Sequence, residues 1–327
     1  MDSILRQSFR DFKFLIMDDA SEDETPQIIK TYKDDRIRYV RNESCLGVAN
    51  TLNRGLELVH SEFVARMDAD DVSVKRRLEW QVQFMRLHSE IAVSGMWVKS
   101  FGDPSAAGIE NSLTKPSSIK ALMLFCNPLY HPVVIMRKAC LDEHKLRYDP
   151  TFSRCEDYEL WIRTSRFFSI GNIGRVGLRW RKHRENVTVT HGNAMTEQVL
   201  QLQSDQLKRI GVMADQEQIR FHHAIGAGKR LASMLELKKG ELWLNQVRDA
   251  MLTTSLFSEN GVHEAIGFVW FRLCCNSTPL GPSIISRYLF SDLRKGYHPS
   301  ARQWITFILS ILWHRGLRGT KSYIMAS

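Results

Sequence analysis

The sequence has no apolar run long enough to cross a membrane as a helix. Its most apolar stretch, residues 304–313, has about ten residues, half of the roughly 20 that a spanning helix needs. The N-terminus lacks the apolar core of a secretory signal peptide. We therefore expect the chain to lie in the cytoplasm, with at most a peripheral contact at the inner face of the membrane.

Cysteine is scarce: the chain has six cysteines, and no two of them have the Cys-x-x-Cys spacing. Nothing in their distribution indicates a disulfide framework, and a reducing compartment fits. The adjacent pair Cys274 and Cys275 allows a reading as a palmitoylation or metal site. We favour the interpretation that both are buried, small apolar side chains.

Acidic residues are few near the C-terminus, where residues 281–327 carry seven Lys and Arg against one acid, Asp292. Over the whole chain, 45 Lys and Arg outnumber 36 Asp and Glu, which gives a formal net charge of +9. Such a surplus favours nucleic acid, an anionic membrane or a phosphorylated substrate as the partner. No nucleic-acid-binding motif of recognisable type is present, so we expect no nucleic acid partner and favour the other two.

Residues 302–321 combine the apolar stretch with Trp304, Trp313 and flanking basic residues. A segment of this kind can lie in the interface of a membrane, as a peripheral contact. It can equally form a buried C-terminal helix. The sequence leaves these two readings open.

Carboxylates end a short apolar segment at residues 63–71, which reads Phe-Val-Ala-Arg-Met-Asp-Ala-Asp-Asp. A strand that ends in Asp-x-Asp delivers acids to the carboxyl edge of a sheet, where open α/β folds bind ligands. Hard oxygen ligands suit Mg²⁺ or Mn²⁺, and these ions usually arrive with substrate phosphates. From Asp68 and Asp70 we therefore predict a site in which a divalent metal ion binds the diphosphate of a substrate.

A second apolar segment, residues 12–17, also ends in acids, Asp18 and Asp19, and a helix start follows. Residues 37–40 predict a short strand between the two acidic segments. The alternation of strands and helices predicts an α/β fold with a mostly parallel sheet flanked by helices.

The pattern changes near residue 192, beyond which long helical stretches predominate. We therefore predict two domains. The first, residues 1–192, carries the acidic segments, and the second, residues 193–327, is a helical C-terminal region.

Seven motifs, in order, resemble the family 2 glycosyltransferases with the GT-A fold, over roughly residues 3–190. They are a helix end at 3–9, a strand and acidic turn at 15–21, a Leu-Gly…Asn-x-Gly segment at 42–55, the Asp-x-Asp strand at 63–71, an acceptor-side segment from Asn127 to His131, a Glu-Asp motif at 156–161, and a basic pair, Arg181 and His183. No single motif decides, but seven in the right order and spacing are a strong signal.

The resemblance implies a GT-A-like, Rossmann-like enzyme that moves a sugar, with inversion, from a nucleotide-sugar donor to a glycan or lipid-linked acceptor. Bacterial surface polysaccharide assembly is the usual setting. Such a transfer needs a metal or cationic clamp on the leaving diphosphate and a base near the acceptor hydroxyl. The resemblance assigns Asp157 as general base and places Glu156 in the acceptor pocket. It assigns Asp70 to Mg²⁺ or Mn²⁺ and Asp68 to the metal or the ribose. It places Asp18 and Asp19 at the nucleotide base, Asn53 in the substrate site, and Arg181 and His183 near the diphosphate.

The chain departs from the family pattern in two places. The match is looser at residues 180–186, which makes His183 the weaker assignment. The chain also begins inside the family's first helix, so the resemblance implies that the family's first strand is missing. That departure makes a catalytically inactive nucleotide-sugar-binding protein one alternative.

Other interpretations of the acidic residues stay open at this level. The run from Asp68 to Asp71 can cap a helix that starts near Ser73, and Glu156 with Asp157 can complement a helix dipole. A receiver-like signalling domain also ends strands in acids, with Asp68 as the phosphate acceptor, although no convincing partner lysine is present.

Overall fold

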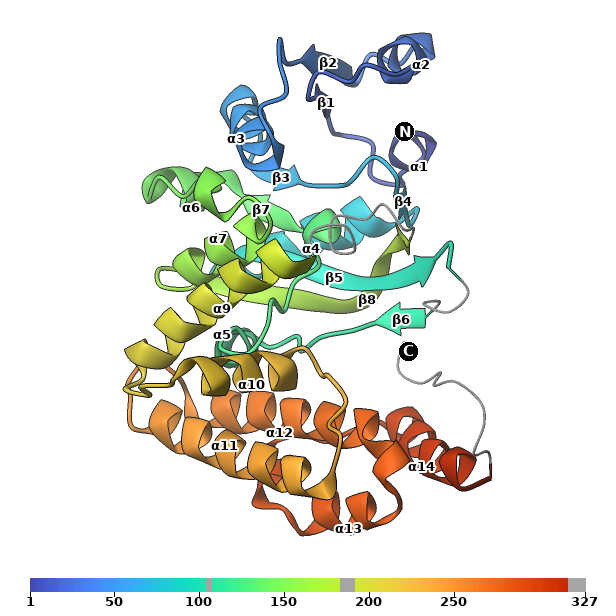
Figure 1. Cartoon of the computed structure of the whole chain (residues 1–327). Coiled ribbons are helices and arrows are strands. Elements are labelled where there is room, and N and C mark those ends of the chain that lie inside the picture. The colour runs from blue at the N-terminus through green and yellow to red at the C-terminus, as the bar shows by residue number, and fades with distance from the viewer. Residues whose placement is uncertain (104–107, 183–191, 317–327) are drawn as a thin grey trace. The chain divides into compact units, whose positions relative to one another are not determined.

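The computed structural model describes residues 1–103, 108–182 and 192–316 (Figure 1). Packing divides the chain into two compact units. The first unit comprises Met1–Phe101 and Leu129–Met195, and the second comprises Gly102–Pro128 and Thr196–Ser327. The predicted α/β class with a helical C-terminal region is confirmed. The break at Met195 lies close to the predicted boundary, but residues 102–128 pack with the C-terminal helices.

The first unit begins with a small parallel sheet. Helix α1 (Asp2–Leu5) is followed by strand β1 (Phe14–Asp18), helix α2 (Thr25–Thr31) and strand β2 (Ile37–Arg41), with Phe14 opposite Ile37. Helix α3 (Val48–Leu58) packs on β1, and a side chain at Gly55 would meet the side chain of Met17. This sheet places the end of β1, with its two acids, beside the start of α3.

The larger sheet of the first unit has the strand order β3-β7-β5-β8-β4. These strands are β3 (Phe63–Ala65), β4 (Val72–Ser73), β5 (Ile91–Phe101), β7 (Ile135–Arg137) and β8 (Ser169–Arg181). Only β5 and β8 pair in parallel within this order, and the other neighbours are antiparallel. The pairing is thus more mixed than the sequence indicated, because an apolar run predicts a strand but not the direction of its neighbours.

Helices and short turns complete the first unit: α4 (Arg77–Leu87), η2 (His131–Val133), α6 (Lys138–Glu143), η3 (Pro150–Phe152) and α7 (Glu156–Thr164). Two apolar clusters join the sheet to these elements. Met85 of α4 packs with Ile91 and Ile135, and Val133 packs with Met96 and Leu178. The sheet and α4 therefore form one core that supports the loop after β3.

The interpretation of Asp68–Asp71 as the cap of a helix near Ser73 is wrong. Val72 and Ser73 form β4, which pairs with β8, and α4 begins only at Arg77. The buried Gln7 explains the difference. Its amide donates to Ser73 Oγ (3.1 Å) and to the carbonyl of Val74 (2.9 Å), and its carbonyl accepts from the backbone of Leu78 (3.0 Å). This contact, distant in sequence, keeps residues 72–74 extended.

Among its described residues, the second unit is helical apart from strand β6 (Gly108–Glu110). Its elements are α5 (Pro116–Leu122), α9 (Gly192–Arg209, whose start belongs to the first unit), α10 (Gln216–Gly226), α11 (Met234–Leu252), α12 (Glu259–Asn276), η4 (Thr278–Leu280), α13 (Ser283–Phe290), η5 (Asp292–Gly296) and α14 (Ala301–Gly316). Helix α12 is buried along most of its length and packs against α5, α11 and η5. Gly261 permits the approach to α5, because a Cβ there would lie 2.6 Å from the carbonyl oxygen of Ser117.

Two sequence-based interpretations concern this unit. Cys274 and Cys275 are both buried in α12, as favoured. Within the described residues, none of the helices has the length and apolar character needed to cross a bilayer.

Candidate active site

The loop between β3 and β4 carries the Asp-x-Asp segment, and two arginines fix it. The backbone of Arg66 donates to the carbonyl of Val134 (3.0 Å), which continues the pairing of β3 with β7. The Arg66 guanidinium holds both oxygens of Asp68, at 2.8 and 2.6 Å. Below it, the fully buried Arg77 donates to the carbonyl of Arg66 and to Gln81 Oε1 (3.0 Å). The Asp68 carboxylate is therefore presented from a rigid backbone and is already paired with a cation.

Asp71, the third acid of the segment, is buried at the end of this loop. Its Oδ1 accepts from the backbone of Arg181 (2.8 Å), and the Arg181 Nε donates to the carbonyl of Asp70 (2.9 Å). Its Oδ2 has no hydrogen-bond partner within the part of the chain that the structure describes. Burial, opposed by the Arg181 hydrogen bond and reinforced by the charges of Asp70 and Asp68, raises the pKa of Asp71 to about 7. The three neighbouring carboxyl groups of this loop thus bring more negative charge together than the single guanidinium of Arg66 can balance.

The first turn of α7 carries the second pair of acids. Glu156 is buried, and its Oε1 lies 3.6 Å from His131 Nδ1. Burial, with the charge of Asp157 adding to it, raises the pKa of Glu156 to about 7. Asp157 is only half-buried, and its Oδ1 accepts from the backbone of Tyr158 (2.7 Å). The two neighbours therefore differ: Glu156 tends to hold a proton near neutral pH, and Asp157 is the one that solvent reaches.

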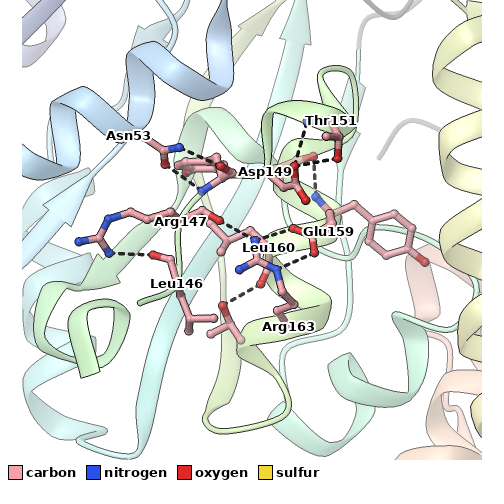
Figure 2. Close-up of polar contacts among 12 residues, drawn as sticks. Asn53, Leu146, Arg147, Asp149, Thr151, Glu159, Leu160 and Arg163 are labelled. Atoms are coloured by element: carbon pink, nitrogen blue, oxygen red, sulfur yellow. Dashed lines mark hydrogen bonds and ion pairs between the residues drawn. The ribbon is translucent and has the colours of Figure 1, made fainter. Parts of the chain in front are cut away.

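Hydrogen bonds fix Tyr148, whose ring contacts Trp161 of α7, and a further pair of side chains within α7. Asn53 of α3 donates to the carbonyl of Tyr148 (2.8 Å) and accepts from its backbone N–H (2.9 Å), as Figure 2 shows for the Asn53 amide. The Tyr148 hydroxyl lies 3.0 Å from His131 Nε2. On the other side of the helix, the Arg163 guanidinium donates to both oxygens of Glu159 (2.6 Å each; Figure 2). In this structure Asn53 thus positions Tyr148, whose hydroxyl lies beside His131.

Asp18 and Asp19 at the end of β1 hold turns in this structure. Asp19 accepts from Asn42 Nδ2 (2.7 Å) and from the backbones of Leu46 and Gly47 (2.8 Å each), just before α3 begins. Burial opposes ionisation of Asp19, but these hydrogen bonds outweigh it and lower its pKa to about 2. Asp18 is buried, where burial opposes ionisation, yet hydrogen bonds from Ser21 and Tyr39 lower its pKa. A contact of either acid with a nucleotide stays a proposal.

Asp19→Asn is expected to destabilise the first unit by about 1–2 kcal/mol at pH 7, because an amide cannot accept from both the Leu46 and Gly47 backbones as a carboxylate does. The folded-state pKa of Asp19 lies below its unfolded value, so its contribution is present above about pH 4 and is lost as the pH falls toward 2. Urea unfolding at pH 7 and pH 2.5 measures the effect. The gap between wild type and variant should narrow at the lower pH, and a constant gap would contradict the account.

The two acidic motifs lie close enough to share one electrostatic environment. The charges of Asp157 and Asp68 raise the pKa of Glu156, and Arg66 opposes them. Arg66 also acts on the buried His131, whose pKa burial and that charge hold well below its usual range. The predicted site residues Asp68, Asp70, Glu156, Asp157 and Arg181 therefore surround one region of the first unit. The remaining prediction, His183, lies outside the described residues.

Arg66, Arg77 and Tyr148 also belong to this region, and sequence reasoning did not single them out. Arg77 is the last residue of the basic run Lys75–Arg77, yet it is buried. The sequence feature that could have indicated Arg66 is its position in the apolar segment, two residues before Asp68.

The donor atoms of this region suit a divalent cation. Mg²⁺ and Mn²⁺ prefer carboxylate oxygens and are usually held by one or two carboxylates together with substrate phosphates. No group of three or more His, Cys, Asp or Glu among the described residues is arranged to hold a metal without a substrate. The unpartnered Oδ2 of Asp71 and the mutual repulsion among Asp68, Asp70 and Asp71 are the features that an added cation would relieve.

Comparison with known proteins shows what the chain is similar to. Residues 1–129 match the model of glycosyl transferase family 2. Together with the relatives below, this match shows that the chain is a glycosyltransferase. This glycosyltransferase is 26% identical, over 71% of its length and 78% of the relative's, to an uncharacterized glycosyltransferase of Haemophilus influenzae. It is 28% identical, over 69% of its length and 86% of the relative's, to WfaP of Escherichia coli, named as a UDP-Glc:α-D-GlcNAc-diphosphoundecaprenol β-1,3-glucosyltransferase.

Solved structures agree on the fold of the glycosyltransferase. The crystal structure of S. aureus TarS 1–349 in complex with UDP-GlcNAc superposes with a TM-score of 0.51 at 17% identity, over 96% of this chain and 86% of that one. The glycosyltransferase spans 57–62% of the length of two other relatives, one bacterial and one archaeal. The receiver-like alternative finds no support, since the acids at the ends of β1 and β3 belong to separate sheets.

Proposed function

We propose that this glycosyltransferase transfers a sugar, with inversion, from a nucleotide-sugar donor to a lipid-linked acceptor during assembly of a bacterial surface polysaccharide. The observation that carries the proposal is that the Asp-x-Asp loop and the first turn of α7 contact the same segment. The backbone of Arg66 donates to the carbonyl of Val134 (3.0 Å), and His131, three residues earlier, lies 3.6 Å from Glu156. A donor-side acidic loop and an acceptor-side carboxylate within one electrostatic environment are what a displacement at a sugar carbon requires. Relatives named for diphosphoundecaprenol-linked substrates or for amylovoran biosynthesis support the setting.

Each acid has a distinct role in this proposal. Asp70 and Asp68 would hold Mg²⁺ or Mn²⁺, which when bound would neutralise charge on the leaving diphosphate. Asp157 removes the proton of the acceptor hydroxyl, and Glu156, held beside His131, orients the acceptor. Asp18 and Asp19, with Asn53, would contribute to the donor site. Arg181, joined to the backbone of Asp70, would lie beside the diphosphate, with His183 as a further candidate.

The buried environment of Glu156 supports assigning the base to Asp157. When two neighbouring carboxyl groups differ in environment, the buried one keeps its proton and the more exposed one ionises first. Burial raises the pKa of Glu156 to about 7, so at pH 7 about half of its carboxyl groups already carry a proton. The more exposed Asp157 is the group that can accept one.

A transfer assay tests the proposed function. The purified chain would be incubated with Mn²⁺, a radiolabelled donor (UDP-Glc, UDP-GlcNAc or GDP-Man) and a synthetic polyprenyl-diphosphate-linked GlcNAc, and the lipid fraction would be counted. We expect label in the lipid fraction with one donor only and no transfer after chelation with EDTA. Binding of the nucleoside diphosphate without transfer to any lipid-linked acceptor would favour the catalytically inactive alternative.

Lipid-linked acceptors lie at a membrane surface. We therefore keep the proposal that residues 302–321 make a peripheral membrane contact, of which residues 317–321 lie outside the described part of the chain. This proposal concerns the second unit alone and is independent of the chemistry at Asp157.

A further inference from the structure

Helix α14, the red helix of the second unit in Figure 1, exposes an apolar stripe on one side and buries the opposite side. Phe307, Ser310 and Ile311 are buried, and Ser310 shares a hydrogen bond with Thr278 of η4 (2.8 Å). The exposed stripe follows the spacing i, i+3, i+4, i+7 that places side chains on one helix face. Its residues, each between 43% and 58% exposed, are Ile305, Ile308, Leu309 and Leu312.

The two borders of this stripe carry the side chains that suit a membrane interface. At 3.6 residues per turn, the exposed Arg302 lies beside Leu309 at one border, and the half-buried Trp304 lies beside Ile308 at the other. The Trp304 ring packs against Tyr288 of α13, with ring centroids 5.4 Å apart. Tryptophan and tyrosine rings are enriched where an apolar surface meets lipid headgroups.

A cationic cavity opens at the tryptophan border. It has a volume of about 310 Å³, and its lining contains no acidic residue. Its walls are formed by Tyr288, Arg294, Lys295, Tyr297, His298, Pro299 and Trp304. Since one water occupies about 30 Å³ of liquid, the cavity has room for a phosphate group with part of a glycerol backbone.

The charge of this cavity is available to an incoming anion. Lys295 pairs with Asp292 at 2.6 Å, but both side chains are more than 70% exposed, and such surface pairs are weak and easily exchanged. Arg294 Nε donates to the carbonyl of Leu289 (2.7 Å), which fixes the orientation of its guanidinium at the wall. An adjacent cavity shares Lys295 and His298, but there an ion pair between Lys115 and Glu264 (3.1 Å) already compensates charge.

We propose that the face formed by the α14 stripe and this cavity docks on an anionic phospholipid bilayer, with a lipid phosphate in the cavity and the stripe among the acyl chains. Charge complementarity selects this occupant, because residues 281–327 carry seven basic residues and one acid. A second copy of the chain would present the same positive charge to itself. The docking goes beyond the proposed sugar transfer and can fail independently of it, because its test needs no reaction.

Vesicle flotation of the full chain tests the docking. We expect recovery with vesicles of phosphatidylcholine and phosphatidylglycerol (7:3), and little recovery with phosphatidylcholine alone or with the anionic vesicles in 0.5 M salt. Leu309→Glu should lower the partition coefficient at least about tenfold, since it puts a charge where an apolar side chain would be buried. Leu242→Glu, at a similarly exposed leucine of α11, is the matched control and should leave the coefficient unchanged.

A second pair of variants tests the cavity. Each basic residue near an anionic surface is worth about 1 kcal/mol, or about fivefold in the partition coefficient. The double variant Arg294→Gln, Lys295→Gln should therefore lower binding to anionic vesicles by more than tenfold, while Lys238→Gln, Lys239→Gln on α11 should lower it much less.

Four results would overturn the docking: no flotation of the wild type, equal flotation with neutral and anionic vesicles, wild-type binding by Leu309→Glu, or equal losses from the α11 variants. Wild-type binding by the double variant would overturn the headgroup cavity. Circular dichroism of each variant verifies that it folds, which its exposed positions lead us to expect.

Discussion

Asp157→Asn is expected to lower sugar transfer by about 10²–10⁴-fold while leaving donor binding nearly unchanged. This factor is typical for the loss of a positioned general base. The substitution keeps the shape of the side chain and its acceptance from the Tyr158 backbone (2.7 Å), but removes the oxygen that takes the acceptor's proton. Transfer to polyprenyl-diphosphate-linked GlcNAc and calorimetric binding of the nucleoside diphosphate measure the two effects.

Glu156→Gln is the matched control for this prediction. Because burial raises the pKa of Glu156 to about 7, about half of its carboxyl groups carry a proton at pH 7, and an amide imitates that protonated form. We expect its effect mainly on the KM for the acceptor. If Asp157→Asn keeps more than about half of the turnover, the base lies elsewhere. If it loses donor binding, Asp157 is instead a nucleotide or metal contact.

Local pattern was sufficient to predict the elements that carry the acids. The predicted strands at residues 12–17 and 37–40 are β1 and β2, and the helix that carries the Glu-Asp motif is α7. In each case an apolar run of the right length or period was present within the segment itself. The position of the acids shortly after β3 followed from the same pattern, since Asp68 lies three residues beyond the last residue of the strand, Ala65.

Contacts between distant segments account for what the sequence could not predict. Residues 72–73 became a strand because Gln7 holds them beside β8, and no pattern near residue 72 contains that information. Arg77 is buried because the carbonyl of Arg66 and the side chain of Gln81 satisfy it there. Residues 102–128 joined the second unit because α5 packs against α12, where Ser118 Oγ donates to Glu264 (2.6 Å).

The sequence was sufficient to predict the acidic residues of the site, but not the arginine, Arg66, that lies among them. Asp-x-Asp and Glu-Asp are visible as motifs, whereas the central place of Arg66 depends on how β3 and α7 come together in space. Arg66 pairs with Asp68 and acts on Glu156 and His131 at once. In physical terms, it supplies part of the positive charge that three acids in four residues need, and a divalent cation with the donor diphosphate would supply the rest.

Asp70→Asn is therefore expected to abolish metal-dependent binding of the nucleotide-sugar donor while leaving the fold intact. A unit charge about 4 Å from a cation is worth about 4 kcal/mol per unit of cation charge at an effective dielectric of 20, so we expect affinity to fall at least about 100-fold. The substitution keeps the backbone carbonyl that accepts from Arg181, so the loop should keep its shape. Calorimetric titration of UDP and GDP, with and without Mn²⁺, measures the affinity.

The control for Asp70→Asn is Asp11→Asn, which removes an exposed carboxylate of the same unit outside this region and should leave metal-dependent binding unchanged. A second readout separates a lost metal contact from a general change of charge. Because the Asp70 charge helps to raise the pKa of the buried Asp71, that pKa should fall in Asp70→Asn, as NMR titration of the carboxyl carbon would show. Unchanged Mn²⁺-dependent binding together with the lowered Asp71 pKa would place Asp70 in the site but exclude it as the metal ligand.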